Sequence, residues 1–387
     1  MAESHRVVKP QHMEPVSPQN WMTGFFQGEQ PRWQPGKGFL PRLLACAQTQ
    51  RAHVLLVEQL LTQQETLELS PAVVRELATR QRQEFALEML RREEVSRMVA
   101  ALGEAGLPFL LFKGTPLAYT LYPDACLRDR SDTDLLFESR AAAEEAWQVL
   151  QDLGYERMNT PGGELVSYQF PCILRGGQVA EMLDVHWATS NAAELRPLSF
   201  RELWDQSIAV PSLGAAARSP CHEHALVLAC LHRLAHVKDG EENRLIWLYD
   251  IHLLLQSLDE AQWQRFLACA RDKGVAGACC DGVEHAADRF GISDRGALRR
   301  EELRQLAALP GQHVVVHATM LERDIAQLRA AQGLRRVQLL GEYLFPPADY
   351  MQARYQPRWR WLLPWYYARR IAQGTGRRLR SHRDGSR

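Results

Sequence analysis

The stretch between residues 105 and 190 limits the fold most, because short apolar runs alternate there with helical patterns. The apolar runs of strand length are residues 108–112, 132–137, 166–174 and 179–187. The helical patterns between them are residues 115–122 and 141–153. The last two runs are joined at Arg175-Gly176-Gly177, which is a hairpin signal. Strands interleaved with helices over so few residues predict a small mixed sheet.

Helical patterns fill most of the remaining chain. Residues 39–65 and 71–103 have apolar positions at helical spacing, and Ser70 followed by Pro71 is a helix start signal. Almost every segment from residue 199 to residue 344 also has a helical pattern. We therefore expect an α+β fold, in which N-terminal helices and a larger all-helical C-terminal domain flank the small sheet. The expected divisions are an irregular segment 1–38, a helical arm 39–104, a core 105–195, a helical domain 196–350 and an aromatic, arginine-rich segment 351–387.

Two carboxylates stand one residue apart in the second apolar run. A strand repeats every two residues, so Asp132 and Asp134 point to the same face, roughly 6–7 Å apart along the strand. Like charges this close repel each other, and they need either a cation or raised pKa values. Mg²⁺ typically binds one or two carboxylates together with substrate phosphates. The pattern therefore predicts a divalent-cation site.

A third acid lies in the last apolar run. Asp184 and His186 share one face of that strand, and Leu183, Val185 and Trp187 share the other. We expect Asp184, on a neighbouring strand, to complete a metal-binding triad and to act on an attacking hydroxyl. The alternative is a buried, hydrogen-bonded structural acid, and His186 is expected to support the site rather than to catalyse.

The first apolar run ends in a turn of the kind that binds phosphate. Gly114 follows Lys113 and allows backbone N–H groups to approach phosphate oxygens at a helix N-terminus, where Thr115 follows. Lys113, or Arg128 and Arg130 in the next loop, would neutralise further phosphate charge. The alternative for the two arginines is an ion pair with neighbouring acids.

The residues just described resemble the nucleotidyltransferase superfamily that includes DNA polymerase β, whose signature is a Gly-Gly or Gly-Ser turn, then Asp-x-Asp, then a third Asp. More closely, Phe-Lys-Gly, Leu-Tyr-Pro, Leu-Arg, Asp-x-Asp-Leu-Leu and Leu-Asp-Val-His-Trp resemble a little-characterised bacterial family known as nucleotidyltransferase family proteins. The resemblance covers about residues 110–190. Here the turn is Gly-Thr, in which Thr supplies the hydroxyl that Ser supplies in the Gly-Ser form. The spacing of 18 residues from Gly114 to Asp132 is longer than in the shorter members of the superfamily.

The resemblance implies roles for these residues. Asp132 and Asp134 would bind two Mg²⁺ ions, and Asp184 would bind the second ion and help to deprotonate the acceptor hydroxyl. Gly114 and Thr115 would hold the β- and γ-phosphates of a nucleoside triphosphate. The hydroxyl would attack the α-phosphorus in line and release pyrophosphate, with metals about 3.5–4 Å apart stabilising both oxygens.

The acceptor is left open by the sequence: a small molecule, a protein side chain or an RNA end. The competing interpretation is a non-catalytic protein that keeps the fold and binds a nucleotide or a nucleic acid.

Two features of the later helices have structural alternatives. His222, His224, His232 and His236 lie in or beside one helix. The i,i+4 spacing of the last two can share a zinc ion, but residue 233 is Arg and no third ligand is placed, so packing or substrate contact is favoured. Asp250 lies in an apolar helix, and if buried it needs a partner. The family resemblance implies that this helix could form a wall of the nucleotide pocket, but a structural role is favoured.

Charge is unevenly distributed along a chain with 46 basic and 46 acidic residues. Residues 354–387 contain ten arginines and a single acid, interleaved with aromatic residues, so their local charge is +9. This end predicts an anionic partner, either RNA held by stacking and phosphate contacts or an anionic membrane surface. The alternative is an aromatic clasp over the helical domain.

Three observations bear on the compartment. No apolar stretch reaches the ~18–20 residues needed to cross a bilayer, so no transmembrane segment is expected. Residues 1–37 have no continuous apolar region of the kind found in secretory signals. The eight cysteines contain no CxxC pair. Together they predict a reduced, cytoplasmic environment.

Overall fold

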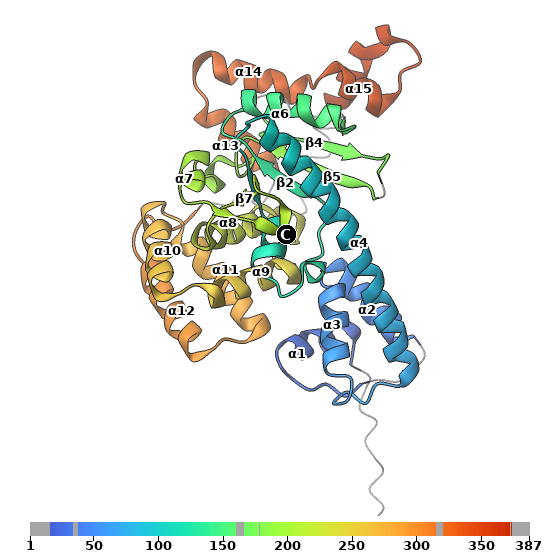
Figure 1. The fold of residues 1–387 in the computed structure, drawn as a ribbon. Helices are drawn as coiled ribbons and strands as arrows, with labels where there is room; N and C mark the ends of the chain where they lie inside the picture. The colour runs from blue at the N-terminus through green and yellow to red at the C-terminus, as the bar shows by residue number, and fades with distance from the viewer. Residues whose placement is uncertain are drawn as a thin grey trace, which may run out of the picture.

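A computed structural model describes residues 16–33, 38–159, 166–177, 179–314, 320–371 and 373 of the chain. Its N-terminal part consists of helices α1 (Pro18–Phe26), α2 (Phe39–Thr49), α3 (His53–Thr62) and α4 (Pro71–Glu104). In α4, Pro71 follows the Ser70 cap as predicted, and the Ser70 hydroxyl accepts a hydrogen bond from the Val73 N–H. In Figure 1, α4 runs from the N-terminal helices to the sheet.

The N-terminal segment differs from the prediction in two places. Residues 1–38 were expected to be irregular, but α1 forms there because Trp21, Met22 and Phe25 give it an apolar face that is buried with α2 and α3. The helical pattern over 39–65 is divided into α2 and α3, because Arg51 turns the backbone with a φ of 54°. Residues 1–15 lie outside the described part of the chain.

The central sheet has five strands in the order β1-β2-β5-β4-β3. β2 and β5 are parallel, and every other pair is antiparallel. The elements are β1 (Leu110–Phe112), α5 (Gly114–Thr120), β2 (Thr133–Leu136), α6 (Arg140–Asp152), β3 (Glu156–Arg157), β4 (Gln169–Leu174) and β5 (Glu181–His186). The predicted small mixed sheet and the β4–β5 hairpin are confirmed. β3 was not predicted, since two exposed polar residues carry no strand pattern.

The sheet is covered on both faces. Leu111, Leu135 and Val185 face one side, where they pack in a core that includes residues of α4 and α6. Phe112 and Leu136 face the other side and join a core made mainly by the later helices. Successive side chains of a strand point to opposite faces, so Asp134, one residue before Leu135, lies on the side of the later helices.

The C-terminal half is largely helical, as predicted. Its helices are α7 (Phe200–Asp205), α8 (His222–Ala235), α9 (Leu245–Ser257), α10 (Glu260–Asp272), α11 (Ala276–Phe290), α12 (Asp294–Ala307), α13 (Met320–Ala330), α14 (Gly333–Leu344) and α15 (Ala348–Tyr355). The two-stranded pair β6 (Ile208–Ala209) and β7 (Arg218–Ser219) was not predicted. Short 3₁₀ turns are η1 (Ala125–Leu127), η2 (Ala193–Leu195), η3 (Pro211–Leu213), η4 (Val237–Asp239) and η5 (Arg360–Leu362).

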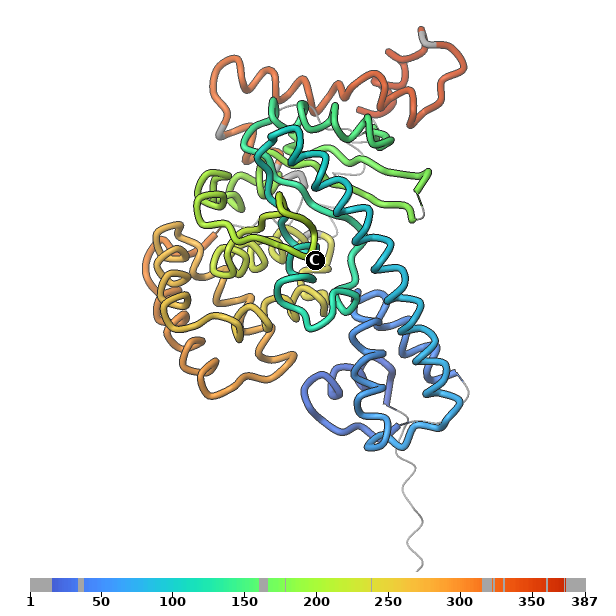
Figure 2. The backbone as a smooth tube through the Cα atoms, viewed as in Figure 1, coloured from blue at the N-terminus to red at the C-terminus, as the bar shows by residue number. Residues whose placement is uncertain are grey.

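The backbone trace shows α14 and α15 at the end of the molecule opposite α1 (Figure 2). Within the part of the chain that the structure describes, no helix combines the length and the apolar composition needed to span a membrane.

Candidate active site

Two of the predicted carboxylates meet on the paired strands β2 and β5. Asp134 and Asp184 are register partners in this parallel pair, so their side chains leave the sheet side by side on the same face. Asp134 is 5% exposed, and Asp184 is partly exposed. The Gln169 amide on β4 donates a hydrogen bond to Asp184 Oδ2 at 2.9 Å. The fold therefore brings together acids that are 50 residues apart in the sequence.

Asp134 has two close partners. His186, the last residue of β5, makes a hydrogen bond from Nε2 to Asp134 Oδ1 at 2.9 Å. Lys113 Nζ donates to the same oxygen at 2.5 Å and lies 4.8 Å from the centroid of the Phe112 ring. The charge of Lys113 and the hydrogen bond of His186, both on one carboxylate oxygen, offset the cost of burying this charged group.

The charge states of these groups follow from their surroundings. Burial disfavours the charged form of Asp134, but Lys113 and the hydrogen bond with His186 outweigh it, so its pKa is held well below the usual range. Burial, together with the positive charge of Lys113, lowers the pKa of His186 to about 4. Burial and the negative charges of Asp134 and Asp132 raise the pKa of Asp184 to about 7. The site thus holds one fixed negative charge beside a carboxyl that titrates near neutrality.

Asp132 lies just before β2. Its Oδ1 accepts a 3.3 Å hydrogen bond from the Ser131 hydroxyl, and its side chain is more exposed than that of Asp134. Burial and the charge of Asp134 raise its pKa above the ordinary value. Asp132 therefore belongs to the same electrostatic cluster as Asp134 and Asp184.

The turn between β1 and α5 is strained at Lys113. Its backbone has a φ of 60° and a ψ of −133°, a conformation normally adopted by glycine, which costs of order 1–3 kcal/mol in other residues. Gly114 follows at the start of α5, and a Cβ there would lie 3.2 Å from the Arg128 guanidinium. The strained turn directs the Lys113 ammonium to Asp134, and Gly114 leaves room for Arg128.

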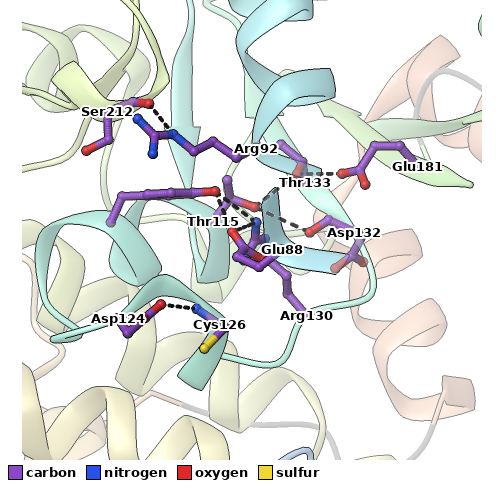
Figure 3. Close-up of polar contacts among 11 residues, drawn as sticks. Glu88, Arg92, Thr115, Asp124, Cys126, Arg130, Asp132, Thr133, Glu181 and Ser212 are labelled. Atoms are coloured by element: carbon purple, nitrogen blue, oxygen red, sulfur yellow. Dashed lines mark hydrogen bonds and ion pairs between the residues drawn. The ribbon is translucent and has the colours of Figure 1, made fainter. Parts of the chain in front are cut away.

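Thr115 points away from the carboxylates, into the sheet. Its hydroxyl hydrogen bonds to the Thr133 hydroxyl at 3.0 Å and to the Asp132 carbonyl at 3.4 Å. Thr133 donates in turn to Glu181 at 3.0 Å, as Figure 3 shows. Burial raises the pKa of Glu181 to about 7, although Thr133 and Arg130 act in the opposite direction. This chain of hydrogen bonds fixes α5 against β2.

The two predicted phosphate-binding arginines are buried and paired with acids other than their sequence neighbours. Arg128 binds Asp250 of α9 through Nε and Nη2, at 2.8 Å and 2.7 Å, and Tyr122 donates a 2.7 Å hydrogen bond to the same acid. Asp250 therefore has the partners that its burial requires. Arg130 donates to Glu88 of α4 at 2.7 Å and is 5% exposed (Figure 3). Their expected contact with phosphate stays a prediction.

A cavity opens beside the Lys113 turn, between α5, α8 and α9. Its volume is about 40 Å³, and its lining includes Lys113, Leu117, Arg128, His232, Trp247 and Asp250. Burial and the positive charge of Lys113 lower the pKa of His232 well below the usual value, so the ring is neutral. Its lining is mostly apolar and includes the charged residues Lys113, Arg128 and Asp250, of which Lys113 also contacts Asp134.

The comparison with known protein families agrees with this geometry. The family model described as an uncharacterised nucleotidyltransferase matches residues 40–291, which include the sheet, both carboxylate-bearing strands and the helices that line the cavity. The chain belongs to this nucleotidyltransferase family. It matches no curated protein and no solved structure. The family identifies nucleotidyl transfer as the general class of activity and a nucleotide as the class of substrate.

The donor atoms of this nucleotidyltransferase fit a divalent cation. Asp134, Asp184 and His186 each offer a ligand atom, and these atoms lie within 4.8 Å of one another. Two carboxylate oxygens suit hard ions such as Mg²⁺, and an imidazole also suits Mn²⁺ or Zn²⁺. Burial first, and then the negative charges of Asp134 and Asp132, raise the pKa of Asp184, and a bound cation would act in the opposite direction.

His186 has a more direct place in the site than the sequence indicated. The sequence already placed it on the face of Asp184, but its contact with Asp134 depends on the pairing of β2 with β5. The other histidines pack as the sequence favoured. The rings of His232 and His236 are 4.8 Å apart and both lie against Trp247. Among the described residues, the only group of three or more metal-ligand side chains contains neither of them.

Proposed function

We propose that this nucleotidyltransferase moves a nucleoside monophosphate from a nucleoside triphosphate to a hydroxyl group of an acceptor, in the presence of Mg²⁺. The observation that carries the proposal is the register pairing of Asp134 with Asp184 on the face that adjoins the cavity. Clustered buried carboxylates destabilise a protein unless a cation or proton offsets their repulsion. A protein that only kept the fold would gain nothing from this cluster.

Asp132, Asp134 and Asp184 would hold the metal, with His186 fixing the orientation of Asp134. When bound, two Mg²⁺ ions would neutralise charge on the triphosphate and on the attacking oxygen. Lys113 occupies Asp134 Oδ1 in the structure, and its flexible side chain could turn from that oxygen to a phosphate once a cation is present.

Asp184 would take the proton of the acceptor hydroxyl. Without metal its pKa is about 7, and a bound cation would lower that pKa, so the carboxylate would be ionised and able to accept a proton at neutral pH. The hydroxyl oxygen would form a bond to the α-phosphorus, the bond from that phosphorus to the β-phosphate oxygen would break, and pyrophosphate would leave. The proton would go from the hydroxyl to Asp184.

The triphosphate would lie over the turn at residues 113–115. Gly114 brings the backbone N–H groups of this turn within reach of phosphate oxygens, and Lys113 adds a movable positive charge. The Thr115 hydroxyl is engaged with Thr133, so Thr115 would contribute its backbone N–H rather than its hydroxyl. Arg128 lines the cavity with its charge paired to Asp250, and Arg130 would position α5 through Glu88 and Tyr119.

The nucleobase would lie over the opening of the cavity formed with α8 and α9, because a cavity of about 40 Å³ is too small to enclose a base. Trp247 and His232 offer ring surfaces, and Leu117 offers an apolar one. This placement puts the base against the helical domain and the phosphates against the carboxylates.

The test measures pyrophosphate release from each of the four nucleoside triphosphates with Mg²⁺ and a cell extract as the source of acceptor. Asp134→Asn should abolish release and labelling of any acceptor, because Asn cannot supply the charge. Asp205→Asn, which changes an acid that is 64% exposed on α7, should leave both unchanged. Equal nucleotide binding with and without Mg²⁺, and no turnover with any extract, would instead identify a binding protein. Identifying the labelled species would separate small-molecule, protein and RNA acceptors.

A further inference from the structure

The C-terminal helices present large apolar side chains to solvent. On α14, Leu334 is 73% exposed, Val337 is 66% exposed and Leu340 is 45% exposed. Beyond α14 the exposed set continues with Phe345 and three tryptophans. We call these seven residues the C-terminal apolar patch: Leu334, Val337, Leu340, Phe345, Trp359, Trp361 and Trp365.

Three residues of the patch lie on α14, which is held to the rest of the protein by a few contacts. Leu339 is 4% exposed, and the Tyr343 hydroxyl donates to Gln327 of α13 at 2.6 Å. Residues 333–338 are all exposed, and the apolar ones on α14 recur every three positions, so Leu334, Val337 and Leu340 form a stripe along the helix. The segment after α15 is tied to α14 and the turn that follows it, because Arg370 donates to the Tyr343 carbonyl at 3.1 Å and the Tyr367 hydroxyl donates to the Pro346 carbonyl. The apolar stripe is therefore held outward by an anchored helix.

Positive charge surrounds the patch. Arg335 and Arg336 are exposed on α14, and Arg358 and Arg369 lie 5.9 Å and 5.5 Å from the ring centroids of Trp359 and Trp365. The sequence from residue 354 to the end adds a local charge of +9. Exposed tryptophans beside arginines, next to an aliphatic stripe, combine the two attractions that hold proteins at an anionic lipid surface.

We propose that the C-terminal apolar patch docks on the surface of an anionic lipid bilayer, with α14 lying in the interface. The aliphatic side chains of the patch favour a membrane surface over RNA as the anionic partner. Leu334, Val337 and Leu340 have no flat face on which a base can stack, but they can insert between lipid headgroups. In Figure 1 the labelled α14 and α15 lie above the sheet, at the opposite end from α1. Docking through them would leave the body of the protein in the aqueous phase.

The experiment is co-flotation of the full-length protein with vesicles. Vesicles of equal parts phosphatidylcholine and phosphatidylglycerol should carry the protein, and vesicles of phosphatidylcholine alone should carry much less. Binding should weaken as salt rises, because the arginine contribution is screened. The double variant R335Q/R336Q should bind roughly 30-fold more weakly, from about fivefold for each arginine. The triple variant L334S/V337S/L340S should lose binding by a comparable factor.

Matched controls are Leu298→Ser, which removes a residue 70% exposed on α12, and Arg201→Gln, which removes an arginine 84% exposed on α7. Both should bind vesicles as the unaltered protein does. The proposal is overturned if the protein floats equally with neutral vesicles or with none. It is also overturned if the stripe variants keep their affinity for anionic vesicles while losing affinity for RNA, or if they only convert a dimer to a monomer in sedimentation.

Discussion

Replacing Asp184 by Asn should stabilise the metal-free protein at alkaline pH. The pKa of this carboxyl rises from an ordinary 3.8 to about 7 through burial and the neighbouring Asp134 and Asp132. A difference of about 3 in pKa corresponds to about 4 kcal/mol, which partial exposure of Asp184 reduces to roughly 2 kcal/mol. The folded protein therefore holds this proton more tightly than the unfolded chain does. Its stability falls as pH rises from about 4 to about 7, and the whole penalty is present above pH 7.

The Asn side chain can still accept the hydrogen bond from Gln169 but cannot ionise. The stability of the variant should therefore not fall as this carboxyl would titrate. The assay is urea unfolding with a metal chelator, near pH 5 and near pH 8. The variant should exceed the original protein by roughly 2 kcal/mol at the higher pH and by clearly less at the lower. Asp205→Asn should follow the original protein at both values. An identical fall in stability for Asp184→Asn and the original protein would refute the electrostatic account of the cluster.

The remaining predictions concern packing around the site and use thermal and urea unfolding. Glu88→Ala should cost about 3–5 kcal/mol, because it leaves the buried Arg130 without its anion, whereas Glu76→Ala, at an exposed pair, should stay within about 0.5 kcal/mol. Equal effects would show that the Glu88 pair is not buried in solution. Trp21→Ala should cost about 3–5 kcal/mol, and no loss would mean that α1 is undocked. Gly114→Ala should cost roughly 1–3 kcal/mol and lower nucleotide affinity, since its Cβ crowds Arg128; unchanged stability and affinity would contradict that contact.

The fold was largely predictable because its elements carry strong local patterns. The start of α4 follows from Ser70 and Pro71, and the β4–β5 hairpin follows from two apolar runs joined by a Gly-Gly pair. Elements with weak local patterns were not found. β3 has two exposed residues, and α1 is a short helix in a Pro- and Gln-rich segment whose apolar face is clear only once α2 packs on it.

The candidate site was predictable only in part, for a physical reason. Strand periodicity places Asp132 with Asp134 and Asp184 with His186, but it does not say which strands pair. The contact of His186 with Asp134 spans 52 residues of sequence. The pairing of Arg128 with Asp250 spans 122 residues, and no neighbouring residue indicates it. Such contacts are decided by the packing of whole elements.

The ion pair between Arg128 and Asp250 also bears on which fragments of this protein could fold on their own. It joins the loop before β2 to α9, and the apolar cluster that covers Phe112 and Leu136 is completed by residues of α8, α9 and α11. A fragment ending near residue 195 would expose that apolar surface and leave Arg128 without the carboxylate of Asp250. In chimaeras between family members, the sheet and the later helices should therefore be taken together from the same parent protein.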